Sequence, residues 1–443
     1  MKHSKYNSIL PLTKRTSMIY NAVTEKFVIF NNNLKHLLMS SPDDIKNAVP
    51  SFYSDLKNGG MLVEDEMNEV EQMVSLGKKY CDNSSTFNLI INPTTNCNFN
   101  CWYCYETHSS HARMAVETIE KVGMFVNNII DKDIKSLKVS FFGGEPLLYY
   151  ENIVRPIIDS IRKKTTETEY RKLNVSYHFT TNGYLVTDQL ISHLSEKSET
   201  KSFQITLDGH REKHNKVRFS ASGRGSYDRI VSNIKKLVCN GMNVGLRINF
   251  TKENASSIIS ILDDFNDLDE EACKLINVDF QKVWQENNIS DDDYVVENAV
   301  SAFREKFRCV SDHYSHVNTF RYPCYADLLN ECVVNYNGDV YKCTARDFIP
   351  ENRLGYLSDT GEIVWDDVEF VESRSCSRFD KKICKECRIF PICGGGCSQL
   401  SVESPDDVCP KHRDELDKDN IILNKFYEHV VMRKENHNVK DTF

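Results

Sequence analysis

Residues 87–104 read FNLIINPTTNCNFNCWYC, an apolar run followed by three closely spaced cysteines. The run Phe87–Asn92 consists largely of apolar residues and predicts a buried strand. Cys97, Cys101 and Cys104 follow it with the spacing CxxxCxxC, and an aromatic residue stands directly before the third cysteine. Three thiolates on one tight loop can bind three corners of a four-iron cluster, which leaves the fourth iron without a protein ligand.

The same spacing would also fit a zinc site, or free thiols that bind nothing. A structural zinc ion would require a fourth Cys or His nearby, and His108 could supply it. The rest of the chain has to separate these interpretations.

A regular alternation of strands and helices begins at about residue 87. The predicted strands are Phe87–Asn92, Ser136–Phe142, Leu173–Phe179, Ser202–Leu207, Val244–Phe250 and Ile276–Phe280. Amphipathic stretches lie between them, among them Ala115–Ile130, Asn152–Lys164, Asp188–Ser195, Tyr227–Val238 and Ala255–Phe265. Six such units predict an α/β fold with a parallel sheet, either doubly wound or curled into a partial (β/α)6 barrel. We expect the barrel, because the unusual residues follow the strand ends, and these meet on one face of a parallel barrel.

The cysteine loop after the first strand resembles the signature of the radical S-adenosylmethionine (SAM) superfamily, and the resemblance extends over about 87 to 410. It implies a partial TIM-like barrel and a [4Fe–4S] cluster held by Cys97, Cys101 and Cys104. The open iron would bind SAM through its amino and carboxylate groups. Reductive cleavage of SAM would then release a 5′-deoxyadenosyl radical, which abstracts hydrogen from the substrate.

Further strand ends resemble the SAM pocket of the same superfamily. Residues 143–146 look like its GGEP motif, whose backbone receives the SAM ammonium group, although a plain turn would also use Gly-Gly and Pro. Thr206 and Arg218 stand where relatives hold the SAM carboxylate, a bidentate role that suits a guanidinium. Asn249 could reach the ribose. The implied cofactor-binding set is Gly143, Gly144, Glu145, Pro146, Thr206, Asp208, Arg218 and Asn249.

Beyond about residue 320 the alternation stops, and cysteines and glycines become frequent. Their order is Cys324-x13-Gly338-x4-Cys343, then Cys384-x2-Cys387-x5-Cys393-x3-Cys397, and finally Cys409. This pattern resembles the SPASM domain of radical SAM enzymes that modify peptides and proteins. Zinc is the alternative, because CxxC pairs commonly bind it. Seven motif cysteines that follow a radical SAM loop favour two auxiliary [4Fe–4S] clusters, and so three clusters in all.

The resemblance also implies how these cysteines are shared. An outer cluster would be held by Cys384, Cys387, Cys393 and Cys409, and an inner cluster, nearer the barrel, by Cys324, Cys343 and Cys397. The fourth ligand of the inner cluster is not fixed by the motif. Cys332 or Cys309 could supply it, or the site could stay open and bind a substrate thiolate. The remaining cysteines, Cys81, Cys239, Cys273 and Cys376, are most simply incidental thiols.

SPASM enzymes follow several reaction types. In the anaerobic sulfatase maturases, which oxidise Cys or Ser to formylglycine, an aspartate follows the cysteine of the Gly-x4-Cys segment and acts as the base. Here Thr344 follows Cys343, although Asp347 or Asp279 could substitute. The other large branch links side chains of ribosomally made peptides. We expect this second type, with a thioether ahead of a carbon–carbon bond, and the sequence identifies no catalytic acid or base.

Two alternatives stay open beside the crosslinking maturase. One is the formylglycine-forming sulfatase maturase. The other is not an enzyme, but an iron–sulfur electron-transfer protein or a zinc-structured binding protein. An electron carrier would leave SAM intact, which separates it from both maturases.

Residues 1–85 predict a small unit of their own. Ser17–Phe30 predicts a hairpin, and Asn33–Met39, Asp43–Asn58 and Asp65–Leu76 predict short helices, as in a winged-helix-like α+β module. Radical SAM enzymes that mature peptides commonly carry such an element, which docks the leader of the precursor as an added strand. The alternative is a segment that only caps the barrel. The predicted domains are thus 1–85, the barrel at 86–310, the SPASM domain at 311–415 and a helix with a charged tail at 416–443.

Composition limits the partners. The net charge of -9 shows no basic excess and argues against nucleic acid. No run of eighteen apolar residues is present and the first residues lack an apolar signal core, so we expect a cytoplasmic protein away from the membrane. In such a chain, sixteen cysteines are more often cluster ligands than disulfides. The resemblance implies a precursor peptide with a leader as substrate and a flavodoxin- or ferredoxin-type electron donor.

Overall fold

The computed structural model describes residues 1–443 apart from 83–84, 133, 168–172, 221–222, 286–291, 308, 312–322, 376 and 428–443. Contacts divide the chain into two compact units, neither of which is one continuous segment. We call them the terminal unit (Met1–Asn83, Val317–Leu329 and Glu372–Phe443) and the barrel unit (Ser84–His316 and Asn330–Val371).

The barrel unit is built on six parallel strands in sequential order, which confirms the predicted α/β class. The strands are β6 (Thr86–Ile91), β7 (Ser136–Phe141), β8 (Asn174–Thr181), β9 (Thr200–Leu207), β10 (Asn243–Phe250) and β11 (Ile276–Lys282). Each strand pairs with the one before it in the chain, so the order never reverses. A doubly wound sheet requires such a reversal. The sheet is therefore that of a partial TIM-like barrel.

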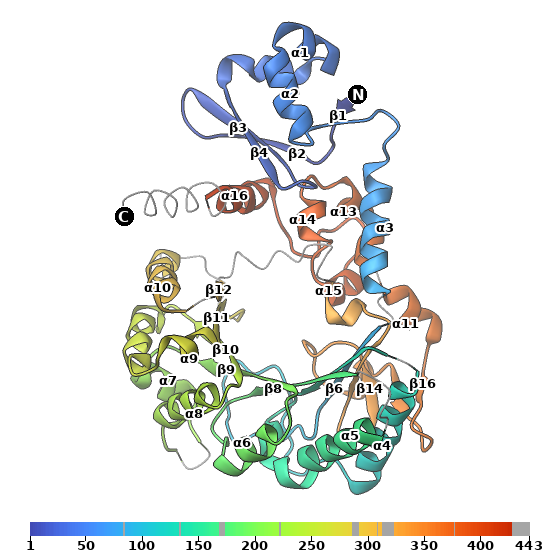
Figure 1. Ribbon diagram of the computed structural model, residues 1–443, viewed down its shortest axis with the longest axis vertical. Coiled ribbons are helices and arrows are strands. Elements are labelled where there is room, and N and C mark those ends of the chain that lie inside the picture. The colour runs from blue at the N-terminus through green and yellow to red at the C-terminus, as the bar shows by residue number, and fades with distance from the viewer. Residues whose placement is uncertain are drawn as a thin grey trace. The chain divides into compact units, whose positions relative to one another are not determined.

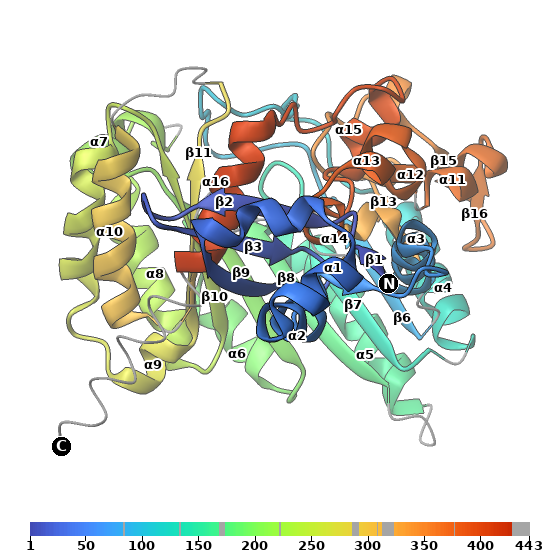
Figure 2. The same cartoon turned by 90° about the horizontal axis from the view of Figure 1, so that it is seen from above.

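Helices cover one face of this sheet, as Figures 1 and 2 show for α4, α5, α6 and α8. Right-handed crossovers between neighbouring parallel strands place every helix on the same side. The segments between the strands are α4 (Val116–Ile130), η2 (Pro146–Tyr149), the π-helical η3 (Tyr150–Val154), α5 (Arg155–Glu167), α6 (Asp188–Ser195), α7 (Arg211–Val217), α8 (Tyr227–Cys239), the 3-10 segment η4 (Ala255–Phe265) and α9 (Glu270–Lys274). The segment α10 (Asp292–Lys306) and strand β12 (Cys309–Ser311), which pairs with β11, follow them.

The two faces of the sheet differ in chemistry. On the helix side, Phe141, Phe179 and Phe203 are fully buried, and their rings stack with centroid distances of 5.3 and 4.8 Å. Because side chains alternate along a strand, their neighbours face the opposite way, into the barrel. Those neighbours are polar on three adjacent strands, namely Ser140, His178, Thr180, Ser202, Gln204 and Thr206. The interior of the barrel is therefore suited to a polar occupant.

Four more strands extend the same sheet beyond β6. Strand β13 (Glu331–Val334) lies parallel to β6, and β14 (Asp339–Tyr341), β15 (Gly355–Leu357) and β16 (Ile363–Trp365) continue as antiparallel neighbours, with η6 (Pro350–Asn352) between β14 and β15. Part of the cysteine-rich region beyond residue 311 is thus joined to the barrel by strand pairing.

The terminal unit begins with the predicted hairpin and a third strand that the sequence did not reveal. Strands β2 (Asn7–Pro11), β3 (Thr16–Asn21) and β4 (Lys26–Asn31) form an antiparallel sheet in this order, and β1 (Lys2–His3) pairs with β5 (Leu62–Val63). The helices are η1 (Asn32–Met39), α1 (Pro42–Ala48), α2 (Pro50–Asn58) and α3 (Glu69–Cys81). The single helix predicted over Asp43–Asn58 is wrong, because Pro50 has no N–H to continue α1 and instead starts α2.

The terminal unit also contains helices of the cysteine-rich region, which we call the cysteine-rich helices, and part of them packs against the first residues of the chain. They are α11 (Val368–Arg374), which begins in the barrel unit, and then α12 (Ser377–Asp380), α13 (Lys382–Glu386), α14 (Phe390–Cys393), α15 (Ser398–Glu403) and α16 (Glu415–Phe426), with η5 (Tyr325–Asp327) before them. One apolar core joins Tyr6 and Tyr20 to Phe379, Phe390 and Ile422. The strands at the start of the chain and the cysteine-rich helices therefore share one core. The predicted tail at 416–443 lies within the described residues only as far as 427.

Two isoleucines test where the core of the barrel unit lies. Ile248 on β10 is fully buried, whereas Ile259 on η4 is 48% exposed. We expect Ile248→Ala to lower the free energy of unfolding by about 2–5 kcal/mol, because it removes buried methyl groups and leaves a cavity. Ile259→Ala should change it by no more than about 0.5 kcal/mol. Urea denaturation of the metal-free chain measures both, and similar losses in the two variants would contradict this core.

Candidate functional site

The cysteine loop leaves the carboxyl end of β6 and is held by its own backbone. The amide of Cys104 donates to the carbonyl of Cys101 at 3.0 Å, and the amide of Phe99 donates to Sγ of Cys97 at 3.4 Å. Burial raises the pKa of Cys97 to about 12, with a smaller contribution from Glu145. The loop thus gathers three thiols that need a metal or a cation to ionise at neutral pH.

The glycine turn after β7 lies directly against this loop. Gly143 has a φ of +100°, and a Cβ there would come within 2.5 Å of the Thr94 carbonyl oxygen. A Cβ at Gly144 would come within 2.3 Å of the Asn96 carbonyl oxygen. The amide of Gly144 donates to Thr94 O at 3.1 Å, and the amide of Glu145 donates to Asn96 O at 2.8 Å. Only glycine permits such an approach of two backbones.

Glu145 and Pro146 serve this contact and do not line the neighbouring cavity. The buried Glu145 carboxylate accepts hydrogen bonds from Thr181 Oγ1 at 2.7 Å, Asn182 N at 2.8 Å and Leu147 N at 3.0 Å. Burial raises the pKa of Glu145, and these three donors oppose the shift. Pro146 starts η2. Of the four residues in the predicted GGEP motif, Gly143 and Gly144 border the cavity.

Tyr103 links the cysteine loop to the end of β9. Its hydroxyl lies 2.8 Å from both carboxylate oxygens of Asp208 and accepts a hydrogen bond from Arg218 Nη1, also at 2.8 Å. Asp208 is 1% exposed and lies 3.4 Å from Arg218 Nη1. Burial raises the pKa of Tyr103, so its hydroxyl stays protonated at neutral pH. No local pattern indicates this role for Tyr103, because Asp208 and Arg218 lie 105 and 115 residues further along the chain.

A cavity of about 200 Å³ opens between these elements. The predicted residues that border it are Cys97, Cys101, Cys104, Gly143, Gly144, Thr206, Arg218 and Asn249. Asp208 does not border it and instead supports Arg218. Nε of Arg218 is buried and has no hydrogen-bond partner among the described residues. The structure therefore brings most of the predicted SAM-site residues around one space and leaves a guanidinium donor unused beside it.

Sequence reasoning missed three charged residues of this cavity, which are Glu106, Arg247 and Lys282. Arg247, on the inner face of β10, is held by a 2.8 Å hydrogen bond from its Nε to Asn249. Glu106 follows the third cysteine closely, and burial raises its pKa to about 7. Glu106 and Arg247 lie near motif residues in the chain. Whether their side chains face the cavity, however, depends on the strand pairing and on the conformation of the cysteine loop.

The segment after Cys343 is hydrogen-bonded to the cysteine loop. Tyr105 donates through its hydroxyl to the Thr344 carbonyl at 2.5 Å. The Asp347 carboxylate accepts from Thr107 N at 3.0 Å and Thr107 Oγ1 at 2.5 Å, and also from the amide of Phe348 at 2.9 Å. Asp347 therefore holds two loops together. The other acid considered as a base, Asp279 on β11, accepts from Gln281 Nε2 at 2.8 Å.

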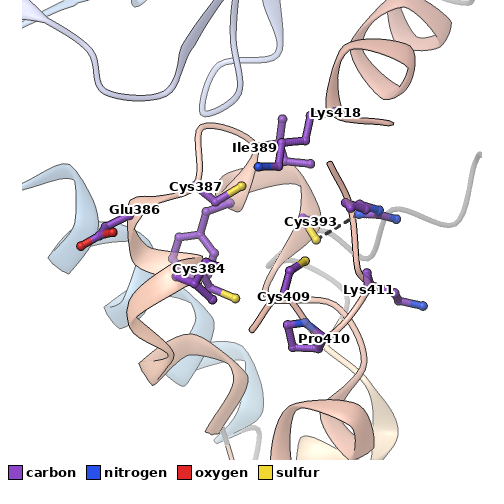
Figure 3. Close-up of a pocket in the computed structure, with 13 residues that line it drawn as sticks. Cys384, Glu386, Cys387, Ile389, Cys393, Cys409, Pro410, Lys411 and Lys418 are labelled. Carbon is purple, nitrogen blue, oxygen red and sulfur yellow. Dashed lines mark hydrogen bonds between the residues drawn. The ribbon is translucent and has the colours of Figure 1, made fainter. Parts of the chain in front are cut away.

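A second cysteine site lies wholly within the terminal unit. Figure 3 shows the sulfurs of Cys384, Cys387, Cys393 and Cys409 pointing into one cavity, whose volume is about 210 Å³. Burial raises the pKa of Cys384 to about 12, and the other three thiols add to the shift. Four converging thiols with positive side chains beside them suit a cysteine-ligated cluster. Among the described residues, no three Cys, His, Asp or Glu side chains meet closely enough to hold a single metal ion.

The remaining motif cysteines are divided between the units. Cys324 and Cys397 lie near each other in the terminal unit, where burial raises the pKa of Cys324 to about 12 and Asp327 and Cys397 contribute. Cys343 belongs to the barrel unit. Cys332 is fully buried in the apolar core of that unit. The side chain of Cys309 lies outside the described residues.

Two tyrosines of the cysteine loop allow a matched test of the Tyr103 contact. We expect Tyr103→Phe to lower the free energy of unfolding by about 1–3 kcal/mol, because buried Asp208 and Arg218 lose a shared partner. Tyr105→Phe should cost less than about 1 kcal/mol, since Tyr105 is 36% exposed and water can replace its hydroxyl. Urea denaturation of the metal-free chain measures both losses. A larger loss in Tyr105→Phe would contradict the importance of the buried contact.

Known proteins share both the sequence pattern and the fold. Residues 91–265 match the radical SAM superfamily. A cysteine-type anaerobic sulfatase-maturating enzyme from Clostridium novyi (strain NT) is 26% identical over 348 residues, which cover 70% of this chain and 88% of that enzyme.

Two solved structures resemble the fold of this chain. Native anSMEcpe with bound AdoMet and Cp18Cys peptide has a TM-score of 0.58 at 20% identity and covers 80% of this chain and 99% of its own. Streptococcus suis SuiB bound to the precursor peptide SuiA has a TM-score of 0.52 at 15% identity and covers 94% of this chain and 99% of its own.

Among the described residues, no helix has the length and hydrophobicity needed to cross a membrane. Residues 91–265 form a radical SAM domain, and this chain is a radical SAM enzyme.

Proposed function

We propose that the chain is a peptide maturase that crosslinks side chains of a ribosomally synthesised precursor, with a thioether as the favoured product. The observation that carries the proposal is the cavity bordered by Cys97, Cys101 and Cys104 and by the guanidinium-bearing Arg218. The three thiols would hold a [4Fe–4S] cluster. When bound, this cluster supplies the electron that cleaves SAM to a 5′-deoxyadenosyl radical.

The residues around the cavity have separate tasks in binding SAM. Arg218 would hold the SAM carboxylate through its guanidinium, because Asp208 and Tyr103 fix this group at the cavity wall. Thr206 and Asn249 border the same space from β9 and β10 and offer a hydroxyl and an amide to the carboxylate and the ribose. The backbone at Gly143 and Gly144 would receive the ammonium group.

Two auxiliary clusters complete the proposal. The outer one would use Cys384, Cys387, Cys393 and Cys409, whose sulfurs face one cavity. The inner one would use Cys324, Cys343 and Cys397, with an open iron as fourth position. The burial of Cys332 among apolar side chains favours the open site over ligation by this cysteine. An open iron would bind and orient a substrate thiolate for bond formation to carbon. The 5′-deoxyadenosyl radical would take the hydrogen atom from that carbon, the thiol would lose its proton on binding, and the auxiliary clusters would accept the remaining electron.

Peptide substrates are supported by two observations. The structures of similar fold include SuiB bound to a precursor peptide and anSMEcpe bound to the Cp18Cys peptide. The barrel interior of this chain is polar beside the cavity, as Gln204 and Arg247 illustrate, and can offer hydrogen bonds to a peptide backbone. A flavodoxin- or ferredoxin-type protein would supply electrons.

Formylglycine formation is the second candidate, because a sulfatase-maturating enzyme is among the relatives. Two features of the site argue against it. Thr344 stands where that reaction would have its aspartate, and Asp347 is occupied by Thr107 and Phe348. A sulfatase-derived peptide and any short cysteine-containing peptide encoded beside this gene, offered separately, distinguish the two reactions by mass spectrometry. Crosslinking removes two hydrogens per bond, whereas formylglycine formation from cysteine replaces the thiol by an aldehyde.

Replacement of one motif cysteine tests the cluster assignment. In anaerobically reconstituted protein, Cys101→Ala should lose about four iron atoms per chain and reduce release of 5′-deoxyadenosine to background. The matched control is Cys239→Ala, which changes an exposed cysteine on α8 outside every motif. Liquid chromatography of the quenched reaction measures the product. Undiminished SAM cleavage in Cys101→Ala would show that the cluster is not held here.

The leader-binding role of residues 1–85 requires point variants, because deletion would expose the core that these residues share with the cysteine-rich helices. Strands β2 and β4 are the edges of the three-stranded sheet, and Ile9 and Ile29 are 41% and 51% exposed on them. If the leader adds as a strand beside β4, Ile29→Asp should weaken leader binding at least about tenfold, or about 1.4 kcal/mol. Ile9→Asp, the matched control, should leave it unchanged.

Fluorescence anisotropy of a labelled synthetic leader measures the affinity, and uncoupled SAM cleavage should be equal in both variants. If Ile9→Asp weakened leader binding and Ile29→Asp did not, the leader would bind beside β2 instead of β4. Wild-type affinity in both variants would contradict a leader-binding role for residues 1–85.

A further inference from the structure

The four-cysteine site of the terminal unit has one cationic neighbour that touches sulfur. Nη1 of Arg413 lies 3.1 Å from Sγ of Cys393, a hydrogen-bonding distance for sulfur, drawn as a dashed line in Figure 3. Arg413 is half-buried, and Cys393 comes from the end of α14. The contact spans twenty residues of sequence, so it is a product of the fold.

Arg413 makes this contact although carboxylates stand next to it in the chain. Asp414 caps α16, and Glu415 pairs with Arg388 and Lys418. No ion pair joins Arg413 to an acid among the described residues, so its charge is not neutralised by the protein there. Arg388, by comparison, bonds to both Glu415 and Asp419. An arginine this close to two acids that pairs with neither is directed toward another anion.

The walls of the cavity show the same excess of positive charge. Lys411, Arg413 and Lys418 border it, and Glu386 is the one acid among the residues that do. Figure 3 shows the Glu386 side chain pointing away from the four sulfurs. The site therefore favours negative charge on its sulfurs.

Positive charge and N–H donors at cluster sulfurs have a general electronic effect. A four-iron cluster bound by four thiolates is an anion, and reduction adds one more negative charge to it. A donor to a ligand sulfur stabilises the reduced form more than the oxidised form, which raises the reduction potential. The effect is largest where water is excluded.

We propose that Arg413 sets the reduction potential of the outer cluster by donating to the Cys393 thiolate. The inference rests on the proposed assignment of that cluster to Cys384, Cys387, Cys393 and Cys409. Arg413 is a positioning residue, since it acts through a ligand sulfur. Its guanidinium makes this cluster easier to reduce than the same four cysteinates would be without it.

The test is an electrochemical titration of the anaerobically reconstituted full chain, followed by electron paramagnetic resonance. The outer-cluster signal is the one absent from Cys384→Ala. Arg413→Met, which removes both charge and donor, should lower its midpoint potential. Arg413→Gln should lower it less, and Arg413→Lys should stay near the wild-type value. The signal of the SAM-cleaving cluster, in the barrel unit, should not move in any of them.

Lys382→Gln is the matched control. It removes one positive charge from α13, the helix that carries Cys384, but Lys382 is exposed and does not border the cavity. Its outer-cluster potential should equal that of the wild type, because water screens an exposed charge.

Iron content separates failure of this inference from failure of the cluster assignment. If Cys384→Ala loses no iron, the outer cluster is not at this site and the inference falls with it. If Arg413→Met and Arg413→Gln keep a full complement of iron and the wild-type potential, only the role of Arg413 is overturned. Should Arg413→Met bind less iron, Arg413→Gln and Arg413→Lys decide the outcome by the same measurement.

Discussion

Two stretches of backbone meet in this protein with no side chain between them. The turn at Gly143 and Gly144 lies against the carbonyls of Thr94 and Asn96, and two amide-to-carbonyl hydrogen bonds join the segments. This contact sets the position of the cysteine loop relative to the ends of the parallel strands. The hydrogen bonds within the loop are local and do not by themselves fix its place on the barrel. The requirement that no Cβ intervene is therefore what places the cluster ligands at the mouth of the barrel.

From this contact, hydrogen bonds spread to the neighbouring strand ends. Glu145 carries the link to β8 through Thr181 and Asn182, and Asn182 returns to the cysteine loop by a 2.7 Å bond to Asn98. Tyr103, Asp208 and Arg218 make the corresponding link to the region after β9. The site is thus a network of buried polar groups supported from several strands, and such networks are rigid when every member has a partner.

Local sequence patterns predicted much of this structure. The six parallel strands and the cysteine loop follow from hydrophobic runs and residue spacing, which are properties of short segments. Contacts between distant segments were not predictable in this way. The pairing of β13 with β6 depends on register, the third strand β2 has little hydrophobic signal, and the role of Asp347 arises only when two loops lie together. Even Pro50, a helix breaker, does not by itself indicate that a second helix begins at once.

The shared apolar core of the terminal unit links two processes that are usually described apart. Tyr6 and Tyr20 pack with Phe379 and Phe390, so the sheet at the start of the chain and the helices that carry the outer cysteines fold together. Metal binding to the folded form stabilises every element in the same cooperative unit. On the proposed assignments, a shortage of iron would weaken leader binding as well as remove the clusters that carry out the redox chemistry. Immature protein would then leave precursor peptides unbound, instead of sequestering them in complexes that cannot react.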